Sequence, residues 1–308
     1  MINKENPSSS LAFDPSHPSN SVSAIVPVFN GAKFIARTLQ AVLGQTVPPA
    51  EVIVINDGSH DNSADIVAGF GDAVTLIQTE NGGAAAARNL GATKASGNWL
   101  AFCDQDDYWL PTKLEKQLTL ANDAPEVHFV LCDYAETTDG VVASRSHLSY
   151  APDDFWRQEP HLDGFVVRQP VTGKLTTFQP SITSTPIVKR RFFSETGGFD
   201  LEVEWGAEDT CFHFRCLSVV PFAVVPQVLM HYNRHPEAGS ADPVVQMRKT
   251  VEVWEYIIAK YPQAQPYRAE LSAGLVELRN ELAESVRYQR RQKVKSFLGL
   301  GQFRKAKS

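Results

Sequence analysis

Three carboxylates lie close together in the segment DQDD at residues 104–107, a composition typical of a cation site. The segment directly follows an apolar run over residues 99–103, which predicts a buried strand. Carboxylates at the end of such a strand are costly unless a cation lies nearby, and open α/β sheets bind ligands beyond the carboxyl ends of their strands. The segment therefore suits Mg²⁺ or Mn²⁺, with a phosphate as a further ligand. A solvated turn that caps the next helix explains it equally well.

Two further segments follow predicted strands. Asp57, within VINDGS at 54–59, could accept a hydrogen bond from a pyrimidine N–H, or the turn could cap the next helix. The segment NGGAAAARN at 81–89 places glycines before a predicted helix that carries Arg88. Glycines allow a backbone to approach a phosphate, and an arginine can bind it through two hydrogen bonds. The segment matches neither the dinucleotide fingerprint GxGxxG nor a P-loop.

Two pairs of polar residues lie near the end of the alternating pattern. Glu208 and Asp209 begin a predicted helix, where the helix dipole favours acidic side chains. The functional alternative is a general base held at a fixed helix end. Arg234 and His235 follow the last predicted strand and precede a loop with Gly and Ser at 239–240. They would close over a diphosphate and a metal, with this loop as a lid.

The elements that must position these residues alternate along the chain. Predicted helices follow predicted strands, and this order indicates a sheet of parallel strands with crossover helices. Residues 135–180 lack a clear period, and we expect hairpins and loops there. The predicted strands cover residues 23–29, 51–56, 74–78, 99–103, 127–134 and 183–189, with two short strands within 221–232. The predicted helices cover 31–43, a stretch up to residue 70, 82–94, 110–120 with Pro111 in its first turn, 208–217, and the region from 244 onward with a break at 262–266.

Composition excludes several classes of protein. The chain has 308 residues and a formal net charge of −6, which argues against a nucleic-acid partner. No apolar run approaches the length of a membrane-spanning helix, and residues 1–20, rich in Ser, Pro and Asn, predict a disordered tail rather than a secretory signal. The four cysteines form no CxxC pair, so we expect buried, reduced thiols in a cytoplasmic protein. Residues 285–308 are basic, which indicates either a solvated helix end or a segment attracted to anionic lipid.

Six segments, in this order and spacing, resemble family 2 glycosyltransferases with the GT-A fold. The resemblance covers residues 22–236 and implies a Rossmann-like α/β fold with a mostly parallel central sheet flanked by helices. It also implies a nucleotide-sugar half over 21–134, an acceptor half over 135–240 and a helical C-terminal extension over 241–308. The matching segments are IVPVFN at 25–30, VINDGS at 54–59, NGGAAAARN at 81–89, FCDQDD at 102–107, GGFD at 197–200 and ED at 208–209.

The resemblance assigns the donor and the metal to named positions. Phe29 and Asp57 would hold the base of the nucleotide sugar, and Arg88 would lie near the base or the diphosphate. The metal, Mn²⁺ or Mg²⁺, would bind Asp106 or its neighbour, with a C-terminal ligand at His235. The complete set of implied donor-binding residues is Pro27, Phe29, Asp57, Arg88, Asp104, Asp106 and Arg234, with Asp104 and Asp106 as the DxD pair and Asp106, Asp107 and His235 as metal ligands.

The resemblance also implies the reaction. Asp209 would deprotonate an acceptor hydroxyl, which would attack the anomeric carbon with inversion. The acceptor would be a saccharide or a lipid-linked saccharide in bacterial surface polysaccharide synthesis, and residues 285–308 would make peripheral membrane contact at the inner face of the membrane. The implied acceptor contacts are Trp205, Glu208 and Gly198. Trp156, Trp205 and Phe178 are candidates for stacking on sugars, with the hydrophobic core as the alternative.

Two positions depart from the family pattern, and three other functions compete with it. The family usually has Asp where this chain has Asn56, and Tyr where it has Phe29, so Phe29 can stack on a base but lacks a hydroxyl. A sugar nucleotidyltransferase would carry a GxGxRL loop near the first strand, which is missing. A dehydrogenase would carry GxGxxG. A catalytically silent nucleotide-sugar binding module would not need both Asp209 and the DxD carboxylates.

Overall fold

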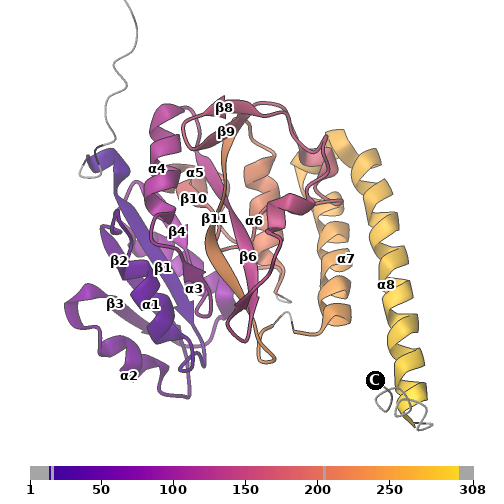
Figure 1. Ribbon diagram of the computed structural model, residues 1–308, viewed down its shortest axis with the longest axis horizontal. Coiled ribbons are helices and arrows are strands. Elements are labelled where there is room, and N and C mark those ends of the chain that lie inside the picture. The colour runs from indigo at the N-terminus through magenta and orange to yellow at the C-terminus, as the bar shows by residue number, and fades with distance from the viewer. Residues whose placement is uncertain (1–13, 15–16, 204–205, 240, 298–308) are drawn as a thin grey trace, which may run out of the picture.

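A mixed β-sheet with helices on both faces forms the body of the protein (Figure 1). The computed structural model describes residues 14, 17–203, 206–239 and 241–297. The strands follow the order β3-β2-β1-β4-β10-β6-β11-β9-β8, with β5 and β7 paired at the side. Strands β3, β2, β1 and β4 are mutually parallel, as are β6 and β11, whereas β10 is antiparallel to both β4 and β6. The predicted Rossmann-like α/β fold is confirmed.

The strands are β1 (Val22–Val28), β2 (Glu51–Asp57), β3 (Thr75–Thr79), β4 (Trp99–Phe102), β5 (Tyr108–Trp109), β6 (Phe129–Thr138), β7 (Val141–Val142), β8 (Glu159–His161), β9 (Gly164–Val167), β10 (Ile187–Lys189) and β11 (Phe222–Arg234). The α-helices are α1 (Ile35–Leu43), α2 (Ser63–Ala68), α3 (Gly83–Lys94), α4 (Lys113–Asp123), α5 (Arg190–Glu195), α6 (Glu208–Leu217), α7 (Pro243–Lys260) and α8 (Arg268–Phe297). Short 3₁₀ turns lie at Pro18–Asn20, Gly71–Ala73, His147–Tyr150, Thr172–Lys174 and Pro262–Tyr267.

The sheet has a hydrophobic core on each face. Strand β1 is buried throughout, because alternate residues enter different cores: Val26 packs with α1, α2 and α4, whereas Ile25 packs with α3 and α6. This burial on both faces explains the continuous apolar runs of the inner strands. The four cysteines are buried and unpaired, as predicted.

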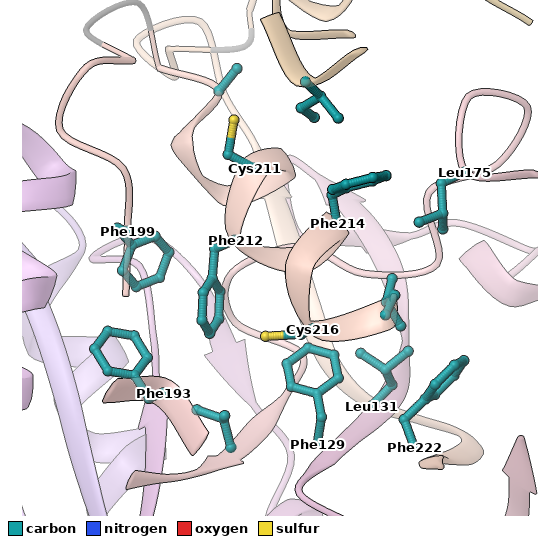
Figure 2. Packing of buried hydrophobic residues seen from close by; sticks show 14 of the residues in the cluster. Phe129, Leu131, Leu175, Phe193, Phe199, Cys211, Phe212, Phe214, Cys216 and Phe222 are labelled. Atoms are coloured by element: carbon teal, nitrogen blue, oxygen red, sulfur yellow. The ribbon is translucent and has the colours of Figure 1, made fainter. Parts of the chain in front are cut away.

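The C-terminal helices belong to the second of these cores. Figure 1 shows α7 and α8 side by side beyond α6. Trp254 of α7 is fully buried and meets the ring of Phe214 of α6 edge-on, with 5.8 Å between ring centroids. On the opposite side of α6, Phe212 lies beside Phe199 and Phe193 (Figure 2). The ring centroid of Phe212 is 4.7 Å from that of Phe199 and 5.3 Å from that of Phe193. The described part of the predicted extension over 241–308 is therefore largely helical, but α7 is part of the main body, and residues 298–308 lie outside the described residues.

Several predicted boundaries are wrong for local reasons. One strand, β11, replaces the two expected within 221–232, because the chain passes Pro226 with a shift in its register against β6. The strand expected over 183–189 is only β10, since residues 182–185 form a turn before Pro186, closed by a hydrogen bond from Thr185 N to Ile182 O. Helix α4 begins at Lys113, so Pro111 precedes it.

At the N-terminus, Pro18–Asn20 form a 3₁₀ turn in which Asn20 is buried, although a disordered tail was predicted through residue 20. The rest of that predicted tail, apart from Asp14 and His17, lies outside the described residues. Within the part of the chain that the structure describes, no helix has both the length and the apolar character that a membrane crossing requires.

Candidate active site

A cavity of about 590 Å³ lies at the carboxyl ends of β1, β2 and β4. This is the position at which open α/β sheets bind ligands, and the volume is within the range of small-molecule sites. Residues from β1, β2 and β4 form one wall, and the start of α6, the 237–239 loop and α7 form another. The predicted residues that line it are Pro27, Phe29, Asp57, Arg88, Asp104, Asp106, Glu208 and Asp209.

Asp57 is buried at the end of β2 and binds the start of α3. Its two carboxylate oxygens accept hydrogen bonds from the backbone N–H groups of Gly82 and Gly83, at 2.8 and 2.9 Å. Asp57 therefore lines the cavity and also satisfies two free amides at the N-terminus of α3, a later helix than the one that the turn was predicted to cap. These two amides are consequently occupied and do not point freely toward a phosphate. Phe29, 42% exposed, lines the same wall.

Arg88 is the buried centre of a charge network. Its guanidinium donates to Asp104 Oδ1 at 2.6 Å and to Glu208 Oε1 at 2.5 Å, and it lies over the ring of Phe199. Burial alone would lower the pKa of Arg88, but the charges of the two carboxylates raise it. The network joins the end of β4 to the start of α6, which are more than a hundred residues apart in the sequence. Glu208, predicted as an acceptor contact, is therefore the partner of Arg88.

Asp106 and His235 meet through the short strand β5. Its antiparallel pairing with β11, Tyr108 with His231 and Trp109 with Met230, brings the acidic segment against the residues that follow β11. His235 Nε2 lies 2.8 Å from Asp106 Oδ2, and His235 Nδ1 is buried without a partner. Burial raises the pKa of Asp106, although the bond to His235 acts in the opposite direction.

Three residues predicted to bind the metal or the donor do not line this cavity: His235, which lines a neighbouring cavity, Asp107 and Arg234. The carboxylate of Asp107 is buried and accepts hydrogen bonds from Ser184 Oγ at 2.5 Å and Asn233 N at 3.4 Å. The Asp107 carboxylate does not line the cavity, so it holds residues 104–107 in place and is not positioned as a metal ligand. Arg234 pairs with Glu136 at 2.9 Å and lines a neighbouring cavity between the 234–243 segment, α7 and α8.

Asp209 lines the cavity one residue into α6. Its Oδ1 accepts hydrogen bonds from Thr210 N and Oγ1, at 2.7 and 3.4 Å. Burial, together with the neighbouring charge of Glu208, raises the pKa of Asp209 to about 6, although Arg88 opposes the shift. A carboxylate with a pKa near the working pH is suited to accept a proton from a hydroxyl.

Several residues predicted to contact the acceptor or stack on sugars do not line the cavity. Trp205 lies outside the described residues. Phe178 is buried in the core, and Trp156 packs against the same core, so both take the alternative role. Gly198 does not line the cavity. It adopts a φ of +63°, next to Phe199, whose N–H donates to Asn89 Oδ1 at 2.9 Å.

Gly198→Ala is therefore expected to destabilise the protein by about 1–3 kcal/mol, through backbone strain and a clash. A Cβ at Gly198 would lie 2.7 Å from Asn89 Oδ1. Gly140 is the matched control, because it has a φ of +80° with open space around the missing Cβ. Urea unfolding of both Ala variants measures the difference. Equal losses of unfolding free energy would mean that the clash with Asn89 has no effect.

Sequence reasoning missed several polar residues of the cavity, among them Gln105, Glu237, and Gln246 and Lys249 of α7. Gln105 Oε1 accepts a hydrogen bond from Phe29 N at 2.9 Å, which fixes the backbone beneath that ring. Gln105 lies inside the acidic segment, but only the carboxylates were considered there. No sequence pattern connects Gln246 and Lys249 of α7 with the strand ends at residues 57 and 104, which lie much earlier in the chain.

The order β3-β2-β1-β4, the cavity at its strand ends and the acidic side chains that line it agree with one family. A family model of glycosyl transferase family 2 matches residues 23–182. The chain belongs to glycosyl transferase family 2. It is therefore a transferase of glycosyl groups, which sets aside the sugar nucleotidyltransferase and the dehydrogenase.

Relatives of this glycosyltransferase agree with the assignment. An uncharacterized glycosyltransferase of Rickettsia prowazekii (strain Madrid E) is 28% identical over 245 residues, 78% of this chain and 72% of that protein. A Bacillus subtilis (strain 168) glycosyltransferase named for teichuronic acid biosynthesis is 41% identical over 101 residues, 32% of this chain and 40% of that protein.

Solved structures share the fold. The crystal structure of S. aureus TarS 1–349 in complex with UDP-GlcNAc has a TM-score of 0.64 and 20% identity, covering 84% of this chain and 72% of that one. Against a longer structure of TarS, the match covers 84% of this chain but only 43% of TarS, with a TM-score of 0.60 and 22% identity.

Proposed function

We propose that this glycosyltransferase moves a sugar from a UDP-linked donor to a hydroxyl group of a saccharide or lipid-linked saccharide, with inversion at the anomeric carbon. The observation that carries the proposal is that one cavity is lined by Phe29 and Asp57, by Asp104 and Asp106, and by Asp209. The fold shared with TarS, which has been crystallised with UDP-GlcNAc, supports a UDP-linked donor. The relative named for teichuronic acid biosynthesis supports a surface polysaccharide as the product.

In this proposal the nucleotide end of the donor binds at β1 and β2. The exposed ring of Phe29 offers a stacking surface for the base. Each oxygen of Asp57 accepts one backbone hydrogen bond and retains a second lone pair, which can accept the N–H of a uracil. Asp57 would thereby read the base while it holds α3 in place.

Asp209 acts as the general base. It accepts the proton of the acceptor hydroxyl as the oxygen forms a bond to the anomeric carbon, and the bond from that carbon to the diphosphate oxygen breaks. UDP leaves with the electron pair of that bond. Because Asp209 is fixed at the start of α6 by the backbone of Thr210, the acceptor oxygen is held on the face opposite the nucleotide. No covalent intermediate with the protein is required.

A divalent cation fits the donor set at Asp106 and His235. Among the described residues, no group of three or more His, Cys, Asp or Glu side chains is placed to hold a metal by itself. The pair offers one carboxylate oxygen and one imidazole nitrogen, and Mn²⁺ or Mg²⁺ in such enzymes takes further ligands from phosphate and water. Bound there, the cation would neutralise charge on the leaving diphosphate. Asp104 stays paired with Arg88, which holds its carboxylate in position.

A donor panel tests the proposal. Thermal shift and nucleotide release are measured with several nucleotide sugars, each with Mn²⁺ or with EDTA. We expect one UDP-linked donor to raise Tm in the presence of Mn²⁺ and to be slowly hydrolysed, with both effects lost in EDTA. Retention of binding and release in EDTA would contradict the metal assignment. A shift without release of nucleotide would favour a silent binding module, and no shift with any UDP-linked donor would contradict the proposed donor.

The basic end of α8 is proposed to contact the cytoplasmic face of a membrane, where lipid-linked acceptors would be reached. Arg287, Arg290 and Arg291 are exposed near the end of the described helix, and further basic residues of the predicted tail lie outside the described residues. Reversing these three to Glu is expected to abolish sedimentation with liposomes that contain anionic lipid, since each basic residue near such a surface contributes about 1 kcal/mol. Unchanged sedimentation of the triple variant would contradict the contact.

A further inference from the structure

The charges that line the cavity are unbalanced, and one cation stands apart. The described lining residues include the carboxylates of Asp57, Asp104, Asp106, Glu208, Asp209 and Glu237, against the cations of Arg88 and Lys249. Arg88 is paired with Asp104 and Glu208. Lys249 has no carboxylate within ion-pair distance among the residues that the structure describes, so its charge is available to a ligand.

The place of Lys249 in the cavity is well defined. It is half-buried on α7, and its Nζ lies 3.3 Å from the position that a Cβ would take on Gly206. Gly206 precedes α6 and lies three residues before Asp209. The ammonium group is therefore on the Asp209 side of the cavity, opposite the wall formed by Phe29 and Asp57. A side chain at Gly206 would meet this group, so the glycine leaves it room.

We propose that Lys249 binds an oxyanion of the nucleotide-sugar donor. The inference rests on the proposed function and extends it to a residue outside the range that the family model matches. The Lys249 ammonium is half-buried among carboxylates but forms no ion pair with a described residue, so it can bind an incoming anion. Charge-assisted hydrogen bonds of this kind are strong. The oxyanion is either the diphosphate or a carboxylate on the transferred sugar, since one continuous cavity holds both ends of the donor.

The experiment measures dissociation constants of UDP, UDP-glucose and UDP-glucuronic acid by calorimetry for the wild type, Lys249→Met and Lys249→Arg. Arg248→Met is the matched control, because Arg248 is the exposed neighbour of Lys249 on α7 and does not line the cavity. Lys249→Met is expected to weaken binding at least about tenfold, the equivalent of about 1.4 kcal/mol. Lys249→Arg is expected to recover part of the affinity, and Arg248→Met to leave it unchanged.

The three ligands separate the two sources of the oxyanion. Equal weakening for all three assigns the diphosphate, whereas weakening for UDP-glucuronic acid alone assigns a carboxylate on the sugar. If the wild type binds UDP and Lys249→Met binds all three ligands as tightly, the inference is overturned and the proposed function stands. If the wild type binds no nucleotide, the proposed function fails and the inference fails with it. Unfolding midpoints of all variants show whether a loss of affinity is a loss of fold.

Discussion

Asp209→Asn is expected to lower kcat by a factor on the order of 10²–10⁴, the range for loss of a general base, while UDP binds as in the wild type. The amide keeps the shape of the side chain and cannot accept the hydroxyl proton. Asp209 lies across the cavity from Asp57 and is not part of the Asp106–His235 pair, so donor and metal contacts remain. Steady-state transfer and calorimetric titration with UDP measure the two effects. Turnover near the wild-type rate would refute the assignment of the base.

The pH dependence gives a second signature of the same residue. With the pKa of Asp209 raised to about 6, transfer should increase as pH rises through 6 and then level off, because the base acts in its deprotonated form. Its effect on stability has the opposite sign. The folded pKa is above the unfolded value of about 3.8, so the folded state binds more protons between these values, and the free energy of unfolding falls as pH rises through this window.

The Asn variant should therefore be more stable than the wild type at pH 7.5, by about 1–2 kcal/mol after allowance for partial exposure. At pH 4 the difference should nearly vanish. Urea unfolding at the two pH values measures it. A variant less stable than the wild type at pH 7.5 would mean that charged Asp209 stabilises the folded state. That result would contradict a pKa raised by burial.

Arg88→Met is expected to lower the free energy of unfolding by about 3–5 kcal/mol, the usual cost of removing one partner from a buried ionic network. Two carboxylates, Asp104 and Glu208, would be left without their common cation. The loss should include activity, since the network fixes the start of α6 and hence Asp209. Urea unfolding and transfer assays measure both effects.

Two further variants make the Arg88 prediction specific. Arg191→Met removes an exposed ion pair with Glu195 and should change stability by less than about 1 kcal/mol. Arg88→Met combined with Glu208→Gln should recover part of the lost stability, because one of the two unpaired charges is then gone. A double variant no more stable than Arg88→Met alone would argue that the guanidinium acts through its packing on Phe199 rather than through charge.

The strands β1 to β4 were predictable because their signals are local. Buried parallel strands appear as continuous apolar runs, and the polar residues that follow each run meet at one edge by the rules of the fold. Asp57, Asp104 and Asp106 lie at that edge for this reason. The start of α6 was equally readable from Glu208 onward, since acidic residues favour a helix N-terminus.

The remaining features depend on contacts that leave no pattern in the sequence. Strand β5 has two residues, too few for any period, yet it decides that Asp106 meets His235. The position of the Asp107 carboxylate depends on its hydrogen bond from the hydroxyl of Ser184, which lies in a turn that was predicted as part of a strand. Lys249 is one of several cations on a long helix, and only packing selects it for the cavity.

The burial of Trp254 against α6 also bears on how the protein is made. The chain emerges from the ribosome with its N-terminus first, so β1 to β11 and α6 are synthesised before α7. Until α7 is made, Trp254 does not cover Phe214, and one side of the helix that carries Asp209 lacks its packing partner. Until the segment of α7 has left the ribosome, the emerged part of the chain would present this aromatic surface to chaperones, and the cavity would lack the wall that Gln246 and Lys249 form.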